Sequence, residues 1–211
     1  MKAINKERRI EILAVVATGL LKFVLMDWLE LRAVYITAAC VFWFVFIYRR
    51  QRIFPNILRR WGFQRAYFKP SFLFLLPFAL IAIMIILIYG LWFNNGLFNW
   101  HIIPVFLLYP VWGIFQQFMI AGLIAGNLRS LSDVHITENQ IVLLTSLLFG
   151  LVHYPSIPLM FYAFTMEILF LKIYFRWTNL WSLGLFHGWV SGLFIFLVCE
   201  RDLWAELWHV F

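Results

Sequence analysis

Residues 112–128, WGIFQQFMIAGLIAGNL, place two adjacent glutamines, Gln116 and Gln117, in the middle of an otherwise apolar run. The whole chain has this apolar character: of its 211 residues, 64% are hydrophobic and 13% are charged. An ordinary soluble domain is about 45–50% apolar and about 25% charged, so this chain has too little charge to cover a surface that faces water. The composition therefore predicts an integral membrane protein.

Apolar runs of the length of a membrane span recur along the sequence. A hydrocarbon core about 30 Å thick needs about 20 apolar residues per helix. No internal repeat or low-complexity segment divides the chain, so we predict one all-α transmembrane domain over residues 1–211, a polytopic helix bundle. About seven transmembrane helices are expected, at residues 10–28, 33–48, 71–93, 101–126, 140–153, 158–175 and 179–198.

Basic residues gather on one side of the predicted membrane. Lys2, Lys6, Arg8 and Arg9 precede the first span, and the longest polar loop, residues 48–70, carries further arginines and a lysine. Short cytoplasmic loops accumulate Lys and Arg, so the pattern predicts an N-in/C-out orientation. The net charge of +7 then reflects topology and contact with membrane lipids, and nucleic acid is not expected as a partner. The short loops favour a prokaryotic cytoplasmic (inner) membrane.

Polar groups within the spans are the candidate functional residues, because a membrane helix places them there at a cost in free energy. Besides the two glutamines these are His153, Glu167 and His187. Each of them alone is equally compatible with an interhelical hydrogen bond worth about 0.6–2 kcal/mol.

The surroundings of the two histidines favour a functional role. Phe149 and His153 lie four residues apart and share a helix face, and so do His187 and Ser191. Glycines beside both pairs allow a neighbouring helix to approach closely.

The order of these motifs resembles the CPBP family, the CAAX-processing and bacteriocin-processing (Abi-type) intramembrane proteases, which include the Ras-converting enzymes. In chain order the motifs are the paired glutamines, FGLVH at 149–153, and a helix in which His187 precedes Ser191 by four residues. The stretches RWGFQR at 60–65 and FRWTNLWSLGLFH at 175–187 add to the resemblance. It covers a core of about residues 60–200.

The first motif departs from the family pattern. Where the family has EExxxR, this chain has Gln116, Gln117 and Ala121. The resemblance implies that the first glutamate of the motif activates a water for attack on a peptide carbonyl. An uncharged amide has no useful basicity, so Gln116 cannot act as that base. Its amide can still hydrogen-bond a substrate or a water.

The other two motifs are kept in outline. The FxxxH motif is intact, and the last motif keeps its histidine but has Ser191 where the family has Asn or Asp. In the family these histidines and the Asn position the water and stabilise the oxyanion. The resemblance therefore implies a substrate-binding set of Gln116, Gln117, Phe149 and Ser191.

Glu167 could supply the missing carboxylate. A buried carboxylate is expensive unless it is protonated, paired or bound to a metal. One hypothesis makes Glu167, His153 and His187 the catalytic residues, either as a base with two orienting groups or as a two-His, one-carboxylate metal site; no other cofactor is expected. The alternative is that Glu167 pairs with Lys172 or Lys22, or faces another helix as a neutral acid.

Three functions remain open from the sequence. The first is a divergent CPBP protein without the usual glutamic protease activity, which binds a membrane peptide or a lipidated protein in the family cavity. The second is an active intramembrane endopeptidase that uses the three residues around Glu167. The third is a lipid-binding or carrier helix bundle. The retained histidines favour the first two, and the loss of both motif glutamates and the arginine favours the first.

Overall fold

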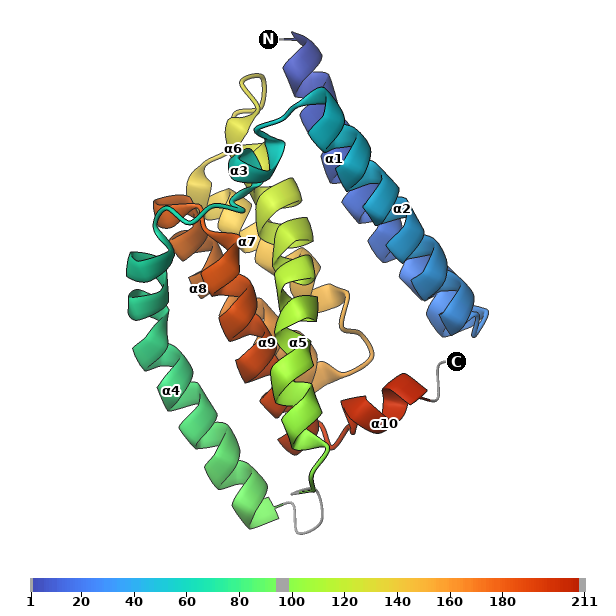
Figure 1. The fold of residues 1–211 in the computed structure, drawn as a ribbon, viewed down its shortest axis with the longest axis vertical. Coiled ribbons are helices and arrows are strands. Elements are labelled where there is room, and N and C mark those ends of the chain that lie inside the picture. The colour runs from blue at the N-terminus through green and yellow to red at the C-terminus, as the bar shows by residue number, and fades with distance from the viewer. Residues whose placement is uncertain (1, 94–98, 209–211) are drawn as a thin grey trace.

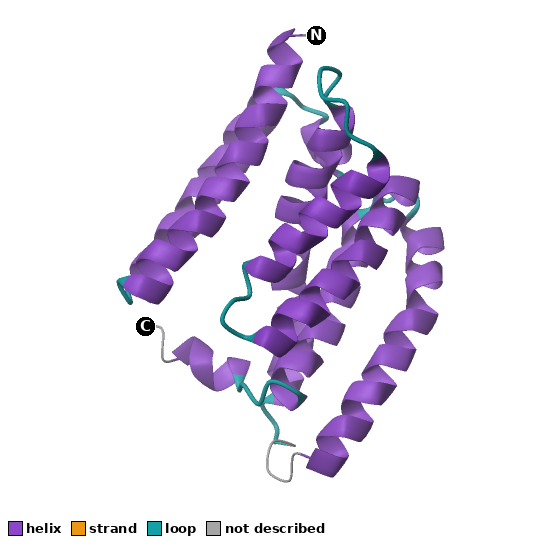
Figure 2. Cartoon of the chain, turned by 180° about the vertical axis from the view of Figure 1, so that it is seen from behind, coloured by secondary structure: helices purple, strands orange, loops and turns teal. Residues whose placement is uncertain are grey.

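The computed structural model describes residues 2–93 and 99–208, and within these ranges every regular element is a helix (Figures 1 and 2). The first half of the chain contains α1 (Lys2–Leu21), the π-helical η1 (Lys22–Trp28), α2 (Arg32–Ile53), α3 (Ile57–Trp61) and α4 (Phe68–Phe93). The second half contains α5 (Ile102–Gln117), the π-helical η2 (Phe118–Ala125), α6 (Gly126–Ser130), α7 (Glu138–Leu151), α8 (Ile157–Trp177), α9 (Leu180–Leu197) and α10 (Leu203–Trp208).

The helix lengths confirm an all-α membrane bundle. Five of the described helices are long and apolar enough to cross a bilayer: α2, α4, the continuous Ile102–Ser130 helix, α8 and α9. The two other predicted spans fall short for different reasons: α7 has only 14 residues, and α1 carries charged residues through its first three turns. The number seven and the N-in/C-out orientation stay predictions.

The centre of the bundle is the pair α5 and α9, which Figure 1 shows side by side between α4 and the α1–α2 hairpin. Glycines make this contact possible. A Cβ atom on Gly188 would collide with the backbone of Pro110, and one on Gly184 would collide with the backbone of Ile114. Glycines four residues apart on one helix face allow two membrane helices to pack backbone against backbone. This close contact brings the last turn of α5 to the middle of α9.

Replacing Gly188 by alanine is therefore expected to lower the free energy of unfolding by about 1–3 kcal/mol, because the added methyl group forces the two helix backbones apart. The matched control is Gly19→Ala on α1, whose Cβ would meet only Val152 Cγ1 at an ordinary 3.5 Å. Thermal unfolding in detergent micelles measures both. Equal stability of the two variants would contradict the proposed role of the α5–α9 contact.

Side-chain caps fix where two of the site helices begin. At α7, Gln140 N donates to Thr137 Oγ1 at 3.3 Å, and Thr137 N donates to Gln140 Oε1 at 2.9 Å. At α9, Ser182 N donates to Asn179 Oδ1 at 3.1 Å, while Asn179 Nδ2 donates to the carbonyl oxygens of the α3–α4 connection. Such caps satisfy backbone N–H groups that would otherwise lack partners. They hold α7 and α9 at fixed heights in the bundle.

A buried ionic network attaches the N-terminal hairpin to the rest of the chain. Glu11 on α1 is fully buried and forms an ion pair with Arg50 on α2. The same carboxylate accepts hydrogen bonds from Trp61 Nε1 at 3.2 Å and from Asn127 Nδ2 at 2.6 Å. The network thus joins α1, α2, α3 and α6 at one end of the bundle. We call this end, which carries the α2–α4 connection at residues 54–67, the basic end.

At the opposite end of the bundle, Asp202 holds the short helix α10. Its carboxylate accepts from Ala205 N at 3.0 Å and lies 2.6 Å from His101 Nδ1. Partial burial opposes ionisation, but the hydrogen bonds from Ala205 and His101 outweigh it, so the pKa of Asp202 lies below its ordinary value. A lowered pKa stabilises the folded state at neutral pH, and this stabilisation is lost only as the pH falls through the lowered value.

Candidate functional site

Gln117, Glu167 and His187 meet in the interior of the bundle. Gln117 Nε2 lies 2.7 Å from Glu167 Oε2 and 3.0 Å from His187 Nδ1. Gln117 and Glu167 are 0% exposed and His187 is 2% exposed. The three side chains come from α5, α8 and α9, so the helix contacts described above create the cluster.

The cluster lies deep in the membrane. His187 follows the start of α9 by seven residues, and Glu167 precedes the end of α8 by ten. At a rise of about 1.5 Å per residue these positions are about 10–15 Å below the basic end. A hydrocarbon core about 30 Å thick places them near its middle.

The amide of Gln117 suits its two neighbours. An amide nitrogen carries two hydrogens, so it can donate one to the Glu167 carboxylate and the other to His187 Nδ1. With Nδ1 as the acceptor, the ring proton of His187 lies on Nε2, where it can be donated to another group. A glutamate at position 117 could supply at most one hydrogen, so glutamine fits this position better.

Two oxygens of the cluster are buried without a hydrogen-bond partner in the described part of the chain, Gln117 Oε1 and Glu167 Oε1. The hydroxyls of Thr145 and Ser146 on α7 are in the same state. Gly150 of α7 faces Met160 and Phe164 of α8, so in this antiparallel pair the two hydroxyls lie at about the height of Glu167. Buried polar atoms usually have partners, so each of these four atoms can still form a hydrogen bond to a water or a substrate group.

Aromatic rings surround the cluster. The ring centroid of Phe149 lies 5.6 Å from that of His187 and 4.8 Å from that of His153. His153 itself is half-buried, and its Nδ1 lies 2.7 Å from the Phe149 carbonyl oxygen of its own helix. Phe149 therefore contacts both histidines, and His153 makes no hydrogen bond to Glu167.

The predicted metal site is not assembled. Among the described residues there is no group of three or more His, Cys, Asp or Glu side chains that could hold a metal ion. The predicted pairing of Glu167 with Lys22 is also wrong, because Lys22 Nζ contacts Asp27 Oδ2 at 2.7 Å. Lys172 is exposed and forms no ion pair with Glu167, which faces the amide of another helix.

Two other predicted residues lie beside the cluster without joining it. Gln116 is half-buried and makes no hydrogen bond to the cluster, so the second glutamine of the pair is the one that contacts Glu167. Ser191 lies one turn beyond His187, and its Oγ is 3.2 Å from Tyr162 Oη and 3.6 Å from Met166 Sδ.

Thr145, Ser146, Tyr162 and Met166 were not among the residues predicted from the sequence. The signal for the first two was present, since two adjacent hydroxyl residues interrupt an apolar run in the same way as the glutamine pair. Tyr162 and Met166 carry no such signal, because aromatic and sulfur side chains are common in any membrane span.

A comparison with family models supports the motif reading. Residues 98–193 match the model described as type II CAAX prenyl endopeptidase Rce1-like. This part of the chain is similar to the Rce1-like family, and the chain is a membrane protein. The matched Rce1-like region is shorter than the predicted core of residues 60–200, but it includes the whole Gln117–Glu167–His187 cluster. No curated protein and no solved structure gives a significant match to the chain.

Proposed function

We propose that this Rce1-like protein hydrolyses a peptide bond of a membrane-anchored peptide or lipidated protein, with Glu167 as the acid–base group. The observation that carries the proposal is the contact of the Glu167 carboxylate with Gln117, which also contacts His187. The family motif has its carboxylates at the positions of Gln116 and Gln117 on α5, whereas this chain has a carboxylate on α8, at Glu167. Gln117, at the motif position, hydrogen-bonds to that carboxylate.

The depth of Glu167 supports a functional role. Ionisable groups in the middle of a membrane are costly and commonly mark functional sites. A purely structural carboxylate would be expected to use both oxygens, yet Oε1 of Glu167 is buried without a partner in the described residues.

The geometry supports the following steps. Glu167 Oε1 accepts a proton from a water, and the oxygen of that water attacks the peptide carbonyl carbon. The N–H at His187 Nε2 donates to the oxyanion that forms, and Gln117 Oε1 accepts a hydrogen bond from the attacking water. Glu167 then returns the proton to the leaving amine as the C–N bond breaks. Such proton transfer by a positioned group typically contributes 10²–10⁴-fold to the rate.

The substrate class follows from the family and from the depth of the cluster. The matched family model describes CAAX prenyl endopeptidases. A site near the middle of the bilayer is reached by a segment that is itself held in the membrane, so we propose a peptide with a lipid or transmembrane anchor. We retain the prokaryotic inner membrane as the proposed location.

A second candidate is binding of such a peptide without cleavage. It is favoured by the replacement of the motif glutamates and arginine by Gln116, Gln117 and Ala121, and by the absence of a contact between His153 and Glu167. In this case the peptide would be held by Phe149, Ser191 and the amide oxygens of Gln116 and Gln117, which lack hydrogen-bond partners in the described residues.

Mapping of protein N- and C-termini in membranes decides between the two candidates. The cells to compare express the wild type, Glu167→Gln or His187→Gln, with Glu30→Gln and His135→Gln as matched controls at exposed positions. We expect termini that appear with the wild type and with both controls and are absent with both site variants. Identical termini in all samples, with every variant folded and equally abundant, would exclude hydrolysis and leave the binding function.

A further inference from the structure

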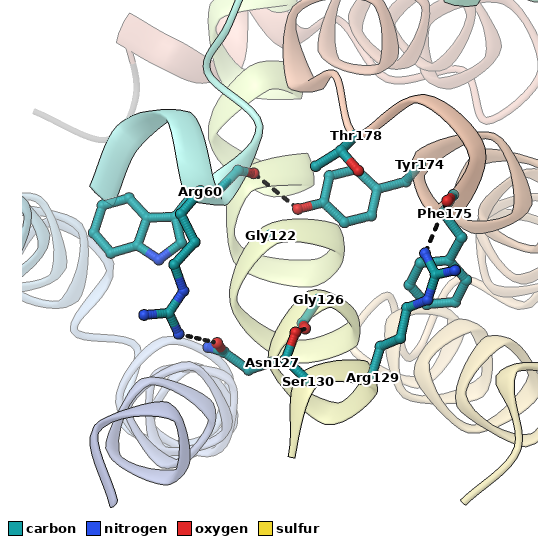
Figure 3. A pocket seen from close by; sticks show the side chains of 10 residues that line it. Arg60, Gly122, Gly126, Asn127, Arg129, Ser130, Tyr174, Phe175 and Thr178 are labelled. Atoms are coloured by element: carbon teal, nitrogen blue, oxygen red, sulfur yellow. Dashed lines mark hydrogen bonds between the residues drawn. The ribbon is translucent and has the colours of Figure 1, made fainter. Parts of the chain in front are cut away.

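A pocket at the basic end is separate from the Glu167 cluster. Its volume is about 220 Å³, and it lies between α3, the η2–α6 segment and the end of α8. In Figure 3 Arg60 and Arg129 lie on opposite sides of it, with the helix that carries Gly122 and Gly126 between them. We call it the arginine pocket; its lining includes Arg60, Trp61, Asn127, Arg129, Tyr174 and Thr178.

Positive charge at the arginine pocket exceeds the negative charge that faces it. The guanidinium of Arg60 contacts the neutral Asn127 Oδ1 at 3.2 Å. Arg8 donates to the Ser130 carbonyl oxygen at the same rim, and its charge repels that of Arg60.

Carboxylates neutralise only part of this charge. Among the described residues, Arg129 has one carboxylate partner, the half-exposed Glu138 at 3.0 Å. Glu11 lies behind Asn127 and is already paired with Arg50. Three guanidinium groups around one pocket, with Glu138 as the carboxylate that pairs with them among the described residues, favour the binding of an anion.

The shape of the arginine pocket restricts the kind of anion. Arg60 and Arg129 are exposed at the rim, whereas Trp61 and Tyr174 are 1% and 3% exposed and form the floor. The volume equals that of about seven water molecules, which accommodates a phosphate with a small polar group but no acyl chain. Guanidinium groups match the geometry of phosphate oxygens.

We propose that the arginine pocket binds the phosphate of an anionic membrane lipid, with Arg60 and Arg129 as its cationic contacts. The acyl chains of the lipid remain in the bilayer beside the bundle. The basic end is the predicted cytoplasmic end, and basic pockets between helices on that side of a membrane bind anionic headgroups. This site does not depend on the proposed hydrolysis, since none of its residues belongs to the Glu167 cluster.

The test measures phosphatidylglycerol binding to the delipidated full chain in neutral detergent, by native mass spectrometry. We expect Arg60→Gln to weaken binding about tenfold, because it removes a charge-assisted hydrogen bond. The matched control is Arg59→Gln, an exposed neighbour on α3 that does not line the pocket. We expect wild-type binding in this control, and weaker binding of zwitterionic phosphatidylcholine to all forms.

Competition by glycerol 3-phosphate and by inorganic phosphate separates a lipid from a soluble anion. Weak competition supports a lipid as the source of the phosphate. Competition at affinities equal to that of the lipid, and lost in Arg60→Gln, would overturn the lipid and assign a soluble phosphate. Equal weakening in Arg59→Gln and Arg60→Gln would overturn the arginine pocket altogether, because binding would then follow diffuse surface charge.

Discussion

Replacement of Glu11 by alanine lowers the free energy of unfolding by about 3–5 kcal/mol, if the buried ionic network acts as its geometry indicates. Among the described residues, the substitution leaves Arg50, which is 7% exposed, with the half-exposed Glu7 as its one remaining carboxylate partner. It also removes the acceptor for Trp61 Nε1 and Asn127 Nδ2. Unfolding by heat or by a denaturing detergent, monitored in micelles, provides the measurement.

Glu138→Ala is the matched control for this prediction. Glu138 also pairs with an arginine, at 3.0 Å, but both side chains are about half exposed, so its loss is expected to cost at most about 1 kcal/mol. The paired substitution Glu11→Met with Arg50→Met should recover much of the stability, because it leaves no unpaired buried charge. A loss in Glu11→Ala no larger than in the control would show that the network does not hold the hairpin.

An exchange of the carboxylate and the amide between positions 117 and 167 is expected to be far less harmful than either change alone. Gln117→Glu alone provides at most one hydrogen for two acceptors, so it loses one hydrogen bond at a cost of about 1–3 kcal/mol. Glu167→Gln alone keeps the shape of the side chain but removes the proposed base. It should reduce His187-dependent cleavage about 10²–10⁴-fold with little change in stability.

In the exchanged variant every contact again joins a donor to an acceptor. The amide at position 167 donates to the carboxylate at position 117, and the His187 ring changes tautomer to donate from Nδ1. We expect the stability of this variant to lie within about 1 kcal/mol of the wild type, which corresponds to a clear coupling energy between the two positions. Cleavage should return only in part, since the cluster again contains a carboxylate but His187 no longer carries the Nε2 proton for the oxyanion.

The control for this double-mutant cycle combines Gln116→Glu with Glu167→Gln, because Gln116 makes no hydrogen bond to the cluster. If the effects of the 117 and 167 substitutions on the free energy of unfolding were additive, the two positions would not share one hydrogen-bond network.

Five of the seven expected spans were predictable from hydropathy, since each coincides with a described helix that is long and apolar enough to cross a bilayer. The helix that carries the glutamines was expected at residues 101–126 and occupies Ile102–Ser130, and α8 was expected at 158–175 and occupies Ile157–Trp177. Glu11 was not recognised, since a single acidic residue inside an apolar run does not reveal its partner. That partner, Arg50, lies 39 residues away.

The site was predictable in its residue types and not in its contacts. The sequence singled out both glutamines, Glu167 and His187, but spacing along separate helices cannot show which side chains meet. Adjacent helical residues point about 100° apart, and the π-helical turn that follows Gln117 alters the helix phase further. Which glutamine faces α8 and α9 therefore depends on the packing at Gly184 and Gly188. The sequence indicated only that another helix can approach these glycines closely.

The short helix α7 has a consequence for the lipid around it. Fourteen helical residues span about 21 Å, about 9 Å less than the hydrocarbon thickness, so α7 alone is too short to cross the bilayer. The loop after it contains irregular backbone, and Lys22 Nζ donates to the Tyr154 carbonyl oxygen there at 3.3 Å. Irregular backbone at membrane depth needs such cover or contact with water. We expect the bilayer to be thinnest beside α7, so that water reaches the interior of the bundle from the side where His153 lies.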